Sequence, residues 1–158
     1  MPNWFATITE FNTPAAINAL RRRRYGVIET AGGQVVAIHL RPWPKLLSWP
    51  EIWPTGGRYH ARGGADRCLL YYNQPRGHAN FLALKYIVST AGTSYATFRA
   101  ALLELDRLAE LKRSDAILCD AANTRLSDRL LARFGWEPHA PARRRRNFIK
   151  RFYGIYPA

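Results

Sequence analysis

The chain has 158 residues, 47% of them hydrophobic and 22% charged, which favours one folded domain and excludes an intrinsically disordered chain. Its 24 Lys and Arg residues face 11 acidic ones, and the net charge of +13 attracts polyanions such as nucleic acid, acidic membrane or a phosphate-rich cofactor. The sequence lacks the features of a secretory signal and any apolar run long enough to span a membrane, so we expect a cytoplasmic protein.

The N-terminal part of the chain predicts strands and one helix. Aromatic and β-branched residues predict a strand over residues 4–9. Thr13 and Pro14 then supply an N-cap and a first helical residue. Two further strands are expected over residues 25–30 and 34–40, and the Ala-Gly-Gly sequence between them predicts a hairpin turn.

Residues 41–66 break this pattern with three Trp-Pro pairs and two Gly-Gly pairs. This composition predicts a loop or lid. Its tryptophans either close one end of the core or form an aromatic wall for a substrate or partner. Both interpretations fit the sequence.

The second half of the chain predicts strands that alternate with two helices. The first helix follows a small-residue turn over residues 89–94 and carries one apolar face, and the second ends at Gly135. We expect strands over residues 67–73, 81–88, 116–120 and 147–153. Strands first and then strand–helix–strand–helix–strand predict a mixed α/β fold with a central sheet flanked by helices. Cys68 and Cys119 lie in apolar runs, which favours buried free thiols.

The turn before the first of these helices has the residues of an anion site. Gly92 is flexible, and Thr93 and Ser94 can cap the helix. The first amides of the helix have no partner within it, and the positive end of the helix dipole lies beside them. Such a turn binds either a phosphate group or only its own side chains.

The block over residues 81–153 contains, in this order, Lys85-Tyr-Ile-Val-Ser89, Ala116-Ile-Leu-Cys-Asp120, Asn123 and Phe134-Gly135-Trp136. The resemblance that these motifs carry is to the GNAT superfamily of N-acetyltransferases. It implies one GNAT-like domain over residues 1–158 with a mostly antiparallel, twisted central sheet. Within that domain, the N-terminal strands and helix span 1–40, the loop or lid spans 41–66, and the cofactor-binding half with a basic C-terminal strand spans 67–158.

The resemblance also implies acetyl-CoA or another acyl-CoA as cofactor and an amine, on a small molecule or a protein, as acceptor. By that implication the pantetheine arm pairs with the backbone of Tyr86, Ile87 and Val88, the pyrophosphate binds the amides of Gly92, Thr93, Ser94 and Tyr95, and the thiol lies near Asn123.

Two features depart from that family's pattern. The loop holds one glycine and no basic residue where the family has Arg/Gln-x-x-Gly-x-Gly/Ala, and Leu131 stands where the family commonly has a tyrosine that protonates the leaving thiolate. By residue type alone, the candidates for a catalytic base are His78, Asp120 and Glu51. The His and Cys residues show no ligand spacing, so we expect no metal.

The charge supports a second hypothesis, a non-catalytic protein of the same fold that binds nucleic acid or another acidic partner. Its candidate residues are Arg143, Arg144, Arg145, Arg146, Lys150 and Arg151. The same residues could instead hold the 3′-phosphate of the cofactor or form a solvated surface. The acceptor, the oligomeric state and the pathway stay open.

Overall fold

The computed structural model describes residues 6–41, 66–89, 92–120, 128–138, 147–152 and 154–156. The expected loop or lid over residues 41–66 lies almost wholly outside these ranges, together with Glu51, Asn123 and the Arg run at 143–146. The side chains of Tyr86 and Asp120 are also outside the description.

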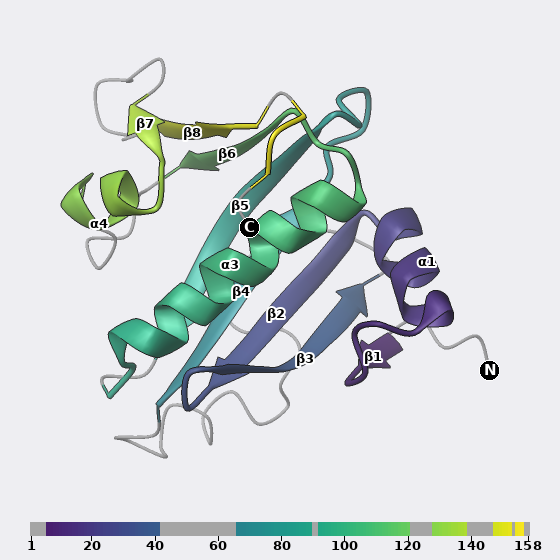
Figure 1. Cartoon of the computed structure of the whole chain (residues 1–158), viewed down its shortest axis with the longest axis horizontal. Helices are drawn as coiled ribbons and strands as arrows, with labels where there is room; N and C mark the ends of the chain where they lie inside the picture. The colour runs from purple at the N-terminus through teal and green to yellow at the C-terminus, as the bar shows by residue number, and fades with distance from the viewer. Residues whose placement is uncertain are drawn as a thin grey trace.

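A single sheet organises the described residues, with strand order β1-β3-β2-β4-β5-β6-β8-β7 (Figure 1). The strands are β1 (Ala6–Ile8), β2 (Tyr25–Ala31), β3 (Gln34–Arg41), β4 (Arg67–Asn73), β5 (Phe81–Ser89), β6 (Ala116–Asp120), β7 (Glu137–Pro138) and β8 (Asn147–Arg151). The helices are α1 (Pro14–Arg22), α3 (Tyr95–Leu111) and α4 (Asp128–Arg133). Strands β5 and β6 pair in parallel, and the other neighbouring strands in this sheet pair antiparallel. The mixed α/β class with a mostly antiparallel sheet is therefore confirmed.

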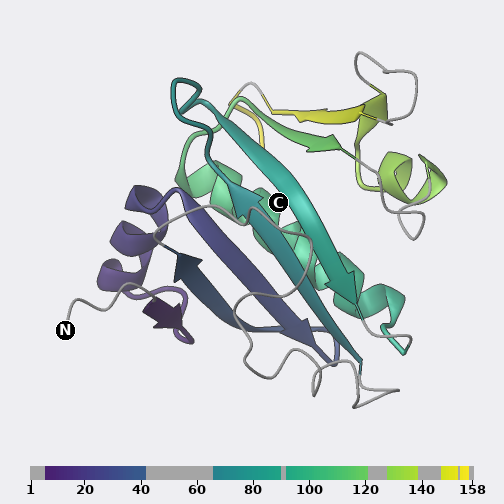
Figure 2. The same ribbon diagram turned by 180° about the vertical axis from the view of Figure 1, so that it is seen from behind.

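Helix α3 covers one face of the sheet and forms the main core with it (Figures 1 and 2). Its buried face includes Ala101, Leu102, Leu105, Leu108 and Ala109, the apolar stripe expected from the sequence. These side chains pack against apolar residues of β2, β3 and β4 that point to the same side, among them Ile28, Ile38 and Leu70. Burial of such side chains contributes about 1.5–3 kcal/mol each before the loss of conformational entropy is counted.

The expected N-caps are present at both long helices. The Thr13 side chain accepts a hydrogen bond from the Ala16 amide at 3.1 Å, and Pro14 begins α1. The Ser94 side chain accepts from the Thr97 amide at 3.3 Å at the start of α3. Each hydroxyl thereby satisfies one donor that the helix itself leaves without a partner.

Gly26 in β2 lets Tyr72 of β4 pass close to the backbone in the core. A Cβ atom at position 26 would lie 2.6 Å from Tyr72 Cζ, well inside the normal contact distance. The Tyr72 ring is 2% exposed, and its hydroxyl has no hydrogen-bond partner in the part of the chain that the structure describes. The close approach of Tyr72 to Gly26 therefore lies within the packed core.

We expect Gly26→Ala to lower the free energy of unfolding by about 1–3 kcal/mol, because the added methyl group overpacks this contact. Tyr72→Leu should restore part of that loss in the double variant, since the smaller side chain makes room for the methyl group. A double-mutant cycle by urea denaturation measures the coupling. Additive losses from the two substitutions would contradict this packing.

Candidate functional site

The parallel strands β5 and β6 diverge partway along their length (Figures 1 and 2). Their register joins Phe81–Leu84 to Ala116–Cys119, whereas β5 continues beside β4 as far as Ser89. The register between β4 and β5 shifts where Tyr72 faces Leu84 and Tyr71 faces Tyr86, which leaves Lys85 as an extra, bulged residue. A bulge bends the strand that carries it, so Lys85 marks where the two strands separate.

The N-terminus of α3 follows the diverging end of β5, and its N-cap residue Ser94 already binds a carboxylate of the chain, that of Asp66. The Ser94 amide donates to Asp66 Oδ1 at 2.7 Å, and the Ser94 hydroxyl donates to Asp66 Oδ2 at 2.8 Å. The Ser94 amide, followed by the Thr97 and Ser94 side chains, outweighs burial and holds the pKa of Asp66 below its ordinary value. Asp66 is therefore ionised at neutral pH beside the positive end of the helix.

The same helix end is tied to the hairpin between β2 and β3. The Gly33 amide donates to Thr97 Oγ1 at 2.9 Å, and Thr30 Oγ1 donates to the Thr97 carbonyl at 3.2 Å. Gly33 has a φ of +79°, a conformation that favours glycine. Thr93 Oγ1 donates to the Arg67 carbonyl at 2.6 Å, so the turn is also fixed to the start of β4.

Helix α4 brings an aromatic ring and a cation to this helix end. Phe134 stacks on Tyr95 with a centroid distance of 5.9 Å, and the Arg133 guanidinium lies over the Tyr95 ring at 5.5 Å. Tyr95 is 48% exposed and Arg133 is exposed. The turn itself contains no basic residue, and Arg133 of α4, about 40 positions later in the chain, lies beside it instead. The local sequence of the turn could not indicate this contact.

The residues predicted for the cofactor loop are only partly brought together by the described structure. Gly92 is exposed, Thr93 and Ser94 are half-buried, and Tyr95 begins α3. Ile87 and Val88 lie on β5 after the bulge. Asp66, which the sequence placed at the end of the loop or lid, was missed as a partner of Ser94 because its hydrogen bonds span 28 positions.

Of the three candidates for a catalytic base, His78 lies away from this end of the molecule. His78 is exposed in the turn before β5, with its ring 6.4 Å from that of Phe81. Strand β5 has nine residues, so His78 and Ser89 lie at opposite ends of it, about 25–30 Å apart. Asp120 ends β6, and Glu51 lies outside the described residues. Leu131 is fully buried in the core.

The two described residues of the expected basic surface both have acidic partners. Lys150 is buried, and its ammonium donates to Asp106 Oδ2 of α3 at 2.6 Å. Burial raises the pKa of Asp106, and the hydrogen bond and charge of Lys150 oppose that shift. Arg151 donates to Glu137 Oε2 of β7 at 2.7 Å near the surface. The interior position of Lys150 removes it from any surface that could meet a polyanion.

Cys68 and Cys119 are buried and form no disulfide, as expected, and desolvation raises the pKa of the Cys68 thiol to about 12. No group of three or more His, Cys, Asp and Glu side chains in the described ranges could hold a metal ion. Among the described helices, none has the length and apolar character needed to cross a membrane.

The chain has a distant structural likeness among solved structures. No family model matches the chain, and no curated protein matches it. The crystal structure of a nourseothricin acetyltransferase is similar over 94% of this chain and 98% of its own, with 10% sequence identity and a TM-score of 0.45. At that TM-score the likeness says nothing about activity or substrate. The described fold itself defines the class, a mixed α/β protein whose parallel strand pair opens beside a helix N-terminus.

We expect Asp66→Asn to destabilise the protein at neutral pH, because the amide replaces an ionised partner of Ser94. The pKa of Asp66 is lower in the folded than in the unfolded chain, so its stabilising effect is present above the unfolded pKa of about 4 and is lost as pH falls through the folded value. The difference in thermal midpoint between the native chain and the variant should therefore shrink from about pH 6 to about pH 3. A difference that stays constant over this range would contradict the ionised contact.

Proposed function

We propose that the protein is an acyl-CoA-dependent N-acyltransferase of GNAT-like fold, with acetyl-CoA or another acyl-CoA as donor and an unidentified amine as acceptor. The observation that carries this function is the divergence of β5 and β6 at Lys85, directly before the turn that begins α3. An acyl-CoA donor is long and thin and is anionic at one end, which suits this arrangement. The backbone of β5 lies along the opening between β5 and β6, and the N-terminus of α3 lies at the end of β5.

The described residues fit such a donor at two points and oppose it at a third. Gly92 is exposed and has no side chain to obstruct a phosphate, and Arg133 supplies a cation over Tyr95. The Ser94 amide, in contrast, is already bonded to the Asp66 carboxylate. We therefore assign the pyrophosphate to the surroundings of Gly92, Tyr95 and Arg133, with Asp66 as a neighbouring negative charge that limits affinity.

The pantetheine arm is assigned to the backbone of Tyr86, Ile87 and Val88, and Asn123 to the neighbourhood of the thiol, as the resemblance implies. When bound, the thioester supplies the acyl group that the amine takes. The chain contributes mainly position, since an amine held against a fixed carbonyl reacts faster than one in solution. The base that accepts the proton of the amine is unassigned, with Asp120 and Glu51 as the remaining candidates by residue type.

Calorimetric titration with CoA tests this function directly. We expect saturable binding to the native chain and loss of binding in Gly92→Trp, because the indole would fill the space next to the first amides of α3. Asn18→Trp on the exposed side of α1 is the matched control and should bind CoA normally.

A second pair of variants tests the assigned charges. Arg133→Gln should weaken CoA binding about 10-fold, the loss typical of one charge-assisted hydrogen bond. Arg129→Gln, an exposed arginine on the same helix, should have no comparable effect. Absence of both a heat of binding and a thermal shift with the native chain at saturating CoA would defeat the proposed function.

The occupied Ser94 amide and the net charge of +13 favour one alternative, a non-catalytic protein that binds nucleic acid or another acidic partner. Its candidate residues are Arg143, Arg144, Arg145, Arg146 and Arg151. Glu137 pairs with Arg151, so the run at 143–146 would carry most of the contact.

For this alternative, we expect affinity for a single-stranded oligonucleotide to fall steeply with salt, with a slope of about −0.7 per phosphate neutralised. Replacing the four arginines at 143–146 with glutamine should abolish binding, and Gly92→Trp should leave it unchanged. Fluorescence anisotropy at several salt concentrations measures both effects. Binding that is independent of salt, or insensitive to the four substitutions, would exclude this alternative.

A further inference from the structure

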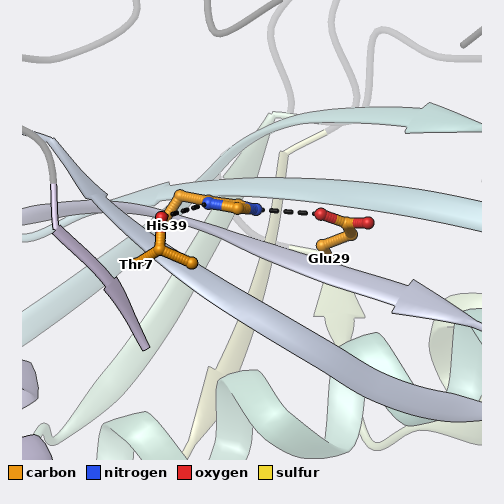
Figure 3. Close-up of polar contacts among 3 residues, drawn as sticks. All are labelled: Thr7, Glu29 and His39. Carbon is orange, nitrogen blue, oxygen red and sulfur yellow. Dashed lines mark hydrogen bonds and ion pairs between the residues drawn. The ribbon is translucent and has the colours of Figure 1, made fainter. Parts of the chain in front are cut away.

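A hydroxyl, an imidazole and a carboxylate form a continuous row across three neighbouring strands (Figure 3). Thr7 Oγ1 of β1 lies 3.0 Å from His39 Nδ1 of β3, and His39 Nε2 lies 2.9 Å from Glu29 Oε1 of β2. An ionised carboxylate can only accept a hydrogen bond, so Nε2 carries the imidazole proton. In the neutral imidazole, the lone pair of Nδ1 then faces the Thr7 hydroxyl and can accept its proton.

The sheet register produces this row. Thr7 and His39 are directly opposite in the antiparallel pair of β1 and β3. Glu29 is opposite Ala37, two residues before His39, so Glu29 and His39 are diagonal neighbours on one face. The side chains of His39 and Glu29 are only 19% and 14% exposed, whereas Thr7 is exposed. The base is thus held in place, and the hydroxyl remains accessible.

This row is separate from the opening between β5 and β6. Ile28 and Ile38 point into the core under α3, and their neighbours Glu29 and His39 point to the opposite face of the sheet. In the register, His39 is aligned through Val27 and Tyr71 with Tyr86 of β5, three strands away or about 14 Å. Neither an acyl-CoA donor at α3 nor the assigned pantetheine contacts involve this row.

We propose that Thr7 is an acyl-accepting nucleophile, with His39 as its general base and Glu29 as the residue that positions the imidazole. A nucleophile hydrogen-bonded to a base, which is in turn oriented by a third group, is the arrangement that activates side-chain hydroxyls. The order of the ring nitrogens is reversed relative to serine proteases, in which the carboxylate holds Nδ1 and the hydroxyl meets Nε2.

The substrate class is a small ester with a good leaving group, which can depart as an anion without first taking up a proton. Thr7 Oγ1 forms a bond to the acyl carbon as its proton passes to His39 Nδ1. The bond between that carbon and the leaving oxygen then breaks, and the leaving group departs as an anion. The product is an acyl ester of Thr7, and the imidazolium returns its proton to solvent.

The test uses p-nitrophenyl acetate with the full chain and no CoA. We expect release of p-nitrophenolate together with one acetyl group on the peptide that contains Thr7, detected by mass spectrometry. Thr7→Val should abolish that acetylation, and His39→Gln should slow it about 100-fold or more, the usual contribution of a general base. Thr7→Ser should remain reactive.

Matched variants separate activation from a structural role. Thr9→Val, at an exposed threonine two positions away, should react like the native chain. Glu29→Gln should slow acetylation, Glu29→Asp should restore part of the rate, and the thermal midpoints of both should be measured beside the rates. If His39→Gln does not fold, the exposed position of Thr7 makes Thr7→Val the deciding variant.

Two results would overturn this activity. Thr7 that stays unmodified at every time sampled while the ester is in excess, with p-nitrophenolate release equal to that of Thr7→Val, would show that the row is only a cross-strand contact. Acetylation that persists in Thr7→Val, on His39 or elsewhere, would assign the reaction to another nucleophile. Because CoA is absent, neither result bears on the proposed acyltransferase function.

Discussion

The attachment of α3 to the sheet is the constraint on which the rest of the structure depends. Its apolar face forms the core, but polar contacts fix its two ends. At the N-terminal end, Asp66 and Gly33 bond to Ser94 and Thr97. At the C-terminal end, the Lys112 ammonium donates to the carbonyls of Arg21 and Arg23 and to Gln74 Oε1, at 2.9, 2.8 and 3.1 Å. Burial, followed by the nearby charge of Arg24, lowers the pKa of Lys112 to about 8, so it remains mostly protonated at neutral pH.

Elements governed by local rules could be predicted from the sequence. The Thr13-Pro14 start of α1, the Ser94 cap of α3 and the apolar stripe of α3 depend on residues within one or two helical turns, and the structure contains all of them. The turn between β2 and β3 likewise needs residues with positive φ, and Gly32 and Gly33 supply them. Such features follow from backbone geometry and short-range hydrogen bonds, which sequence spacing records.

Contacts between distant positions could not be predicted in the same way. Asp66 meets Ser94 from 28 positions away, and Lys150 meets Asp106 from 44. Alternation along a strand tells which residues share a face but not which element covers that face, so Lys150 appeared to be a surface charge. The bulge at Lys85 was also hidden, because an extra residue in one strand is defined only by the register of its neighbour. The geometry of the candidate site therefore depends mostly on pairings that no local pattern encodes.

Neighbouring residues of β2 point to opposite faces of the sheet. Strand β2 therefore contributes both to the polar contacts at the start of α3 and to the Thr7–His39–Glu29 row. The Thr30 hydroxyl supports the start of α3, whereas Glu29, one residue earlier, holds His39 on the other face. The register between β2 and β3 shifts between these two residues. A slip of one residue in the pairing of β2 would turn the Glu29 carboxylate toward α3 and the Thr30 hydroxyl toward the face of His39. Both regions would then lose hydrogen bonds. Correct pairing of β2 is therefore required both for the contacts at the N-terminal end of α3 and for the Thr7–His39–Glu29 row. The two regions nevertheless share no side chain.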